Sequence, residues 1–155
     1  MTLSLIRFGL LSIFLLGLGG TSAELLLLSH TEKVGQFVPL VALGLGLIIV
    51  AWYIVSRSAT ALKSFRWMMG LFVVVAFTGV ILHFLGNVEF ELKKYPDLSG
   101  LSLFWSAITS RVPALAPGTM VLLGLIGWLF TFRNPRLTPK KPHAADLQSH
   151  PSTDI

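Results

Sequence analysis

The sequence contains no cysteine. Disulfides, thiolate metal sites, iron–sulfur clusters and cysteine nucleophiles are therefore excluded. Charged residues are also scarce, at 12% of the chain, against about 25% in an ordinary soluble domain. Hydrophobic residues make up 54% of the 155 residues, which leaves no room for a separate soluble catalytic domain.

Charged residues are missing altogether from three long runs, 37–55, 67–86 and 112–132. About 20 helical residues span the roughly 30 Å hydrocarbon core of a bilayer. Because backbone groups in lipid must hydrogen-bond within their own segment, we expect three transmembrane helices. The predicted fold class is an all-α membrane protein, a small bundle of these spans with an external amphipathic helix.

The first residues allow two interpretations. One basic residue, Arg7, precedes the apolar run 8–20, and the small residues 21–23 follow it. This pattern is typical of a secretory signal cleaved before Glu24. The alternative is a first transmembrane helix over 8–28, which makes the bundle four-helical. Both interpretations place 24–36 on the same side of the membrane.

Charge is distributed unevenly between the segments that flank the spans. Basic residues lie at Arg7, in the predicted loop 56–66 and from Arg133 onward. The positive-inside rule places these segments in the cytoplasm. Segments 24–36 and 87–111 then lie outside. The net charge of +5 thus reflects orientation in the membrane and not nucleic-acid binding. The polar, proline-containing segment 133–155 is predicted to be a disordered cytoplasmic tail.

The external segment 87–111 carries several patterns. Gly86 and Asn87 are typical of a helix end, and residues 88–92 alternate apolar with acidic side chains, which predicts an extended strand. Apolar residues then recur at three- and four-residue intervals over 98–111. This spacing predicts an amphipathic helix in the outer interface, anchored by Trp105. A re-entrant loop is the alternative.

A metal site is one hypothesis for this face. His83 is the ionisable residue within the predicted spans, and His30 precedes a span on the same side. Imidazole with carboxylate suits a transition metal, and haem is a second possibility. The candidate ligands are His30, His83, Glu89 and Glu91, with Glu24, Glu32 and Met120 as further members.

Each of these residues also has a structural interpretation. His83 can bond a neighbouring helix, and Glu32 fits a capping box with Ser29. The remaining acids can lie in solvent or pair with nearby basic residues.

Three strings of the sequence, 24–32, 83–91 and 113–120, are similar to those of small uncharacterised bacterial multi-pass inner-membrane proteins. The resemblance covers residues 24–132. It implies a bacterial inner membrane and carries no activity that transfers to this chain.

The sequence favours a non-enzymatic binding or accessory subunit that uses its external face. Its expected partners are the lipid bilayer and either further copies of the chain or another membrane protein, with no nucleic acid. Small residues four apart, Ala42 with Gly46 and Gly127 with Thr131, permit close helix contact within the chain or between copies. A small oligomeric transporter or channel, and a membrane enzyme using the histidine–carboxylate cluster, are the alternatives.

Overall fold

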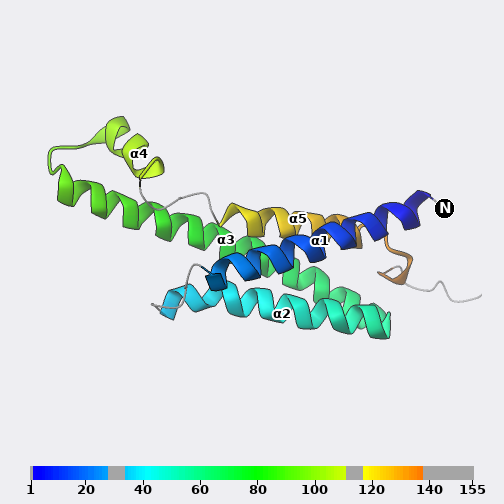
Figure 1. Cartoon of the computed structure of the whole chain (residues 1–155). Helices are drawn as coiled ribbons and strands as arrows, with labels where there is room; N and C mark the ends of the chain where they lie inside the picture. Colours follow the sequence, from blue (N-terminus) through cyan, green and yellow to red (C-terminus); the bar gives the residue numbers. More distant parts are fainter. Residues whose placement is uncertain (1, 28–33, 111–116, 138–155) are drawn as a thin grey trace, which may run out of the picture.

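A computed structural model describes residues 2–27, 34–110 and 117–137, and these residues form an all-helical bundle (Figure 1). The predicted fold class is confirmed. The elements in chain order are α1 (Thr2–Leu27), α2 (Val34–Ser56), α3 (Ala59–Lys94), α4 (Gly100–Ile108), α5 (Gly118–Thr131) and the short 3-10 helix η1 (Pro135–Leu137).

Three of these helices, α1, α2 and α3, are long and apolar enough to cross a membrane. The predicted spans 37–55 and 67–86 fall within α2 and α3. The third predicted span contains α5, an apolar helix of 14 residues, while 112–116 lie outside the described residues. These lengths and compositions are those of an integral membrane protein.

The connection between α2 and α3 is much shorter than the predicted loop 56–66. It consists of Arg57 and Ser58 alone. Arg57 takes a left-handed conformation (φ 50°) and its N–H donates to the carbonyl of Tyr53 at 2.9 Å, which closes α2. Ser58 then caps α3, because its hydroxyl accepts from the N–H of Ala61 at 3.1 Å.

The core of the bundle is aromatic, and α3 lies at its centre between α2 and α5. The Phe14 ring of α1 is fully buried and meets the Phe65 ring edge-on at 5.2 Å. Phe65 in turn meets Phe130 of α5 at 5.7 Å. Helix α1 packs chiefly against α5, so the N-terminal segment contributes to the same core as the last helix.

Small residues set the helix spacing inside this single chain. A Cβ at Gly46 would lie 2.6 Å from the Phe72 ring, and one at Gly124 would lie 2.9 Å from the carbonyl oxygen of Met69. Gly127 lies against the Met69 side chain. Gly46, Gly124 and Gly127 therefore allow close contact with α3 within the chain.

The described charges separate into two ends of the bundle. The basic end is formed by the start of α1, the α2–α3 connection and the end of α5, and it carries Arg7, Arg57, Lys63, Arg66, Arg133 and Arg136. The opposite, acidic end carries every described carboxylate: Glu24, Glu89, Glu91 and Asp97.

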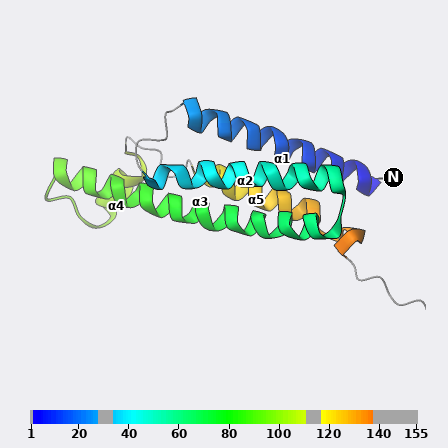
Figure 2. The ribbon, with the colours of Figure 1, turned by 90° about the horizontal axis from the view of Figure 1, so that it is seen from below.

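Helix α3 extends beyond the other helices at the acidic end (Figures 1 and 2). Its 36 residues give a length of about 54 Å, well over the roughly 30 Å of hydrocarbon. The protruding end carries α4.

Candidate functional site

The end of α3 differs from the sequence prediction. The helix does not stop at Gly86 and Asn87, and 88–92 are not extended, because α3 continues to Lys94. Two contacts support this continuation. Lys93 Nζ donates to Glu89 Oε1 at 2.6 Å, one turn away, and Asn87 is fixed against α4 by a hydrogen bond from its side chain.

Two polar residues of α3, Asn87 and Glu91, bond to α4 and to the segment that follows it. His83, Asn87 and Glu91 recur every fourth residue and so share one face of the helix. Asn87 is only 2% exposed, and its Nδ2 donates to the carbonyl of Ala107 at 2.9 Å. Glu91 accepts a 2.7 Å bond from the Ser110 hydroxyl. We call these three residues the polar seam.

Helix α4 confirms the predicted amphipathic helix, with bounds 100–108 in place of 98–111. Ala107 is buried against α3, and the Phe104 ring lies 5.6 Å from that of Phe84. The opposite side of α4 exposes Leu101 (81%) and Trp105 (64%). The helix is thus held to α3 by polar contacts and by the Phe84–Phe104 pair, while Leu101 and Trp105 stay uncovered by the described residues.

The described candidate metal ligands do not gather into one group. An extended strand over 88–92 would put Glu89 and Glu91 on the same side. Because 88–92 are helical, these two side chains point in different directions. Met120 is 2% exposed and belongs to the hydrophobic core, and Glu24 is exposed near the end of α1. Among residues 2–27, 34–110 and 117–137, no three histidine or carboxylate side chains form a group able to hold a metal ion. His30 and Glu32 lie outside the described residues, so the full ligand set stays a prediction.

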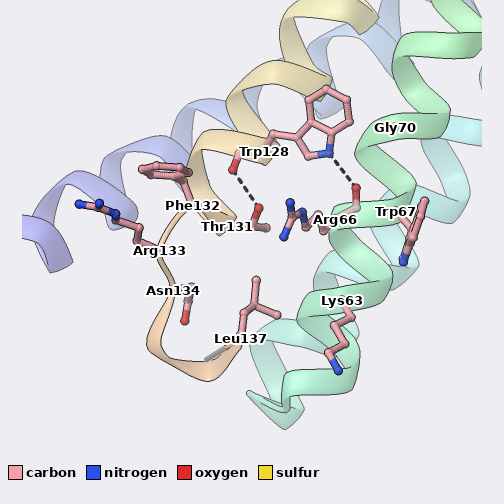
Figure 3. A pocket seen from close by; sticks show the side chains of 10 residues that line it. All are labelled: Lys63, Arg66, Trp67, Gly70, Trp128, Thr131, Phe132, Arg133, Asn134 and Leu137. Atoms are coloured by element: carbon pink, nitrogen blue, oxygen red, sulfur yellow. Dashed lines mark hydrogen bonds between the residues drawn. The ribbon is translucent and has the colours of Figure 1, made fainter. Parts of the chain in front are cut away.

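A second site, which the sequence did not predict, lies at the basic end (Figure 3). It is an open cleft of about 890 Å³ between the first turns of α3, the last turn of α5 and η1. We call it the basic cleft. Its lining residues are Lys63, Arg66, Trp67, Gly70, Trp128, Thr131, Phe132, Arg133, Asn134 and Leu137.

The wall of the basic cleft is held by one hydrogen bond from α5 to α3 and by one within α5. The indole N–H of Trp128 donates to the carbonyl of Arg66 at 2.9 Å, and the Thr131 hydroxyl donates to the carbonyl of Trp128 at 2.8 Å. These bonds fix the Trp128 ring and leave the Arg66 side chain free to turn inward (Figure 3).

The cations of the basic cleft differ in direction. Arg66 reaches inward, towards Thr131, whereas Arg133 points away, towards α1 (Figure 3). The carbonyl of Arg133 accepts a 2.9 Å bond from the Arg7 side chain. Lys63 and Arg66 are both exposed, and every described carboxylate lies at the far end of the bundle. The basic cleft therefore concentrates positive charge beside two tryptophans.

Comparison of the chain with protein-family models, curated proteins and solved structures found no match.

Proposed function

We propose that the protein is a non-enzymatic accessory protein of the bacterial inner membrane that binds a partner membrane protein through α4. The observation that carries this proposal is the arrangement of α4 on the end of α3. Its inner side is fixed by the polar seam, while Leu101 and Trp105 on its outer side are 81% and 64% exposed.

The orientation follows from charge. Basic residues flanking spans are retained in the cytoplasm, and acidic ones contribute little to orientation. The basic end therefore lies in the cytoplasm, which puts the end of α5 and the C-terminus inside and the α3–α4 unit outside. The bacterial inner membrane is the membrane that the resemblance of the strings 24–32, 83–91 and 113–120 implies.

We infer that α1 is retained as a fourth helix and is not removed as a signal. Phe14 and Leu18 are 0% and 1% exposed in the core, and Gly17 contacts Leu123 of α5. Removal of residues 1–23 would uncover the faces of Phe65 and Phe72 that Phe14 covers. A segment needed only for export has no reason to fit the core in this way.

A protein partner suits α4 better than lipid alone. An interfacial anchor needs only an apolar face, because lipid adapts to any position. The Asn87–Ala107 bond instead fixes α4 in one place, and fixed aromatic side chains lose little entropy on binding. Tryptophan is also among the residue types enriched at the energetic centres of protein interfaces.

Transport by a single copy is less well supported. The rings of Phe14, Phe65 and Phe130 pack in a row through the bundle centre, which leaves this region filled by side chains. A transporter or channel would then need a path between copies.

Site-specific photo-crosslinking in native membranes tests the proposal. A photoreactive phenylalanine analogue replaces Leu101 or Trp105 in turn, and Trp67 at the basic end, 82% exposed, serves as the matched control. We expect positions 101 and 105 to yield one protein adduct of the same mass, identified by mass spectrometry as a membrane protein, and position 67 to lack it.

Two results contradict this expectation. Adducts with lipid alone at both positions would make α4 a membrane anchor. An adduct of two copies of this chain would replace the partner by self-association.

A further inference from the structure

The basic cleft lies where one surface of the bilayer should be. Trp67 is 82% exposed and begins the charge-free run of α3. At the other end, exposed Trp105 follows Phe104, which contacts Phe84. The 18 residues from Trp67 to Phe84 span about 26 Å, close to the roughly 30 Å hydrocarbon thickness. Tryptophans favour membrane interfaces, so the basic cleft lies at headgroup level.

The polar part of the basic cleft suits a phosphate. Lys63 and Arg66 are three residues apart on α3 and so lie on the same side of it. The guanidinium of Arg66 reaches into the cleft (Figure 3), and a guanidinium can bind phosphate oxygens through two parallel hydrogen bonds. No described carboxylate is near enough to occupy these cations, because all four lie at the acidic end.

The apolar part continues from the basic cleft towards the bilayer. Gly70 lines the cleft, and Val74 and Phe77 follow it four and seven residues later on the same face of α3. Both are exposed, Val74 by 61% and Phe77 by 58%. A ligand with a charged head in the cleft can therefore extend an apolar chain along this face.

We propose that the basic cleft binds the phosphate headgroup of an anionic phospholipid from the leaflet at the basic end. Arg66 and Lys63 bind the phosphate, the fixed ring of Trp128 forms the wall, and an acyl chain lies along Val74 and Phe77. Basic sites between membrane helices are a recurrent means of selecting anionic lipids. This assignment holds in either membrane orientation and without any partner on α4.

Native mass spectrometry of the full-length, detergent-purified protein tests the assignment, because it counts bound lipids directly. The probes are phosphatidylglycerol and phosphatidylcholine with identical acyl chains. We expect one phosphatidylglycerol to bind at concentrations where phosphatidylcholine does not. The double variant Lys63→Gln/Arg66→Gln should weaken phosphatidylglycerol binding by roughly tenfold or more.

Two further variants separate charge from shape. Lys93→Gln/Lys94→Gln removes the same charge at the acidic end and should leave the affinity within about twofold. Gly70→Leu keeps every charge: its Cβ meets Trp128 Cζ2 at an ordinary 3.5 Å, and its remaining carbons enter the cleft. We expect Gly70→Leu to weaken phosphatidylglycerol binding as well, and it tests the cleft even if the double variant does not fold.

Three results would overturn the proposal: equal affinity for the two lipids, unchanged affinity in both cleft variants, or displacement of the lipid by an equal concentration of glycerol phosphate. The last result would identify a soluble phosphate as the ligand.

Discussion

The contact between α3 and α5 depends on glycine at position 124, and a matched pair of alanine substitutions tests this. A Cβ at Gly124 would lie 2.9 Å from the Met69 carbonyl oxygen and 2.8 Å from Val73 Cγ2. The first neighbour is backbone, so α3 and α5 must move apart. Gly44, in the middle of α2, has nothing within 4 Å of its Cβ position.

The two substitutions are expected to change the free energy of unfolding in opposite directions. Gly44→Ala gains roughly 0.5–1 kcal/mol from helix propensity, with no steric cost. Gly124→Ala gains the same amount but loses about 1–3 kcal/mol to overpacking. The two variants should therefore differ by about 1–3 kcal/mol, with Gly124→Ala the less stable.

The assay is the free energy of unfolding of both variants in the same detergent mixture, with helicity followed during denaturation by sodium dodecyl sulfate. Equal stabilities would refute the close α3–α5 packing described above. A stabilised Gly124→Ala protein would do so more strongly, because it would mean that the methyl group has space.

Three further predictions follow from the polar seam, α1 and the charge distribution. Asn87→Ala leaves the Ala107 carbonyl without its donor, at a cost of about 1–3 kcal/mol, and should speed hydrogen exchange in α4; unchanged exchange would contradict the seam. Intact mass spectrometry of the purified protein should give the full-length chain, and a start at Glu24 would disprove retention of α1. The cysteine-free chain also allows clean topology labelling: in spheroplasts an impermeant maleimide should react with Lys94→Cys, and with Lys63→Cys only after permeabilisation, and the reverse pattern would invert the orientation.

The helices of the bundle could largely be predicted from the sequence, because lipid allows few alternatives to a helix over an apolar run. The errors lie at helix ends. Alternation over 88–92 favours a strand locally, but the Glu89–Lys93 pair and the Asn87–Ala107 bond keep α3 helical to Lys94. The loop 56–66 was predicted from its charges, whereas Ser58 caps a helix that already contains them.

The basic cleft could not be predicted in the same way. It depends on a bond between Trp128 and Arg66, which are 62 residues apart, and no periodicity within either helix specifies that contact. The sequence offers a modest signal. A tryptophan and a basic residue lie close together at the start of one span, as Arg66 and Trp67, and at the end of another, as Trp128 and Arg133. These two flanks together indicate a site at the membrane interface, but they do not indicate which residues bond to each other there.

The packing of α1 on α5 has a consequence for synthesis of the chain. About 90 residues separate the end of α1 from the start of α5. A ribosome needs roughly 5–20 s to add these residues. During that interval α2 and α3 can pair through their two-residue connection, and Phe14 of α1 can meet Phe65 and Phe72 of α3. Gly17 of α1, however, still lacks Leu123 of α5. Helix α1 therefore completes its packing only when the last helix enters the membrane. Assembly of this bundle therefore ends with its first and last helices meeting.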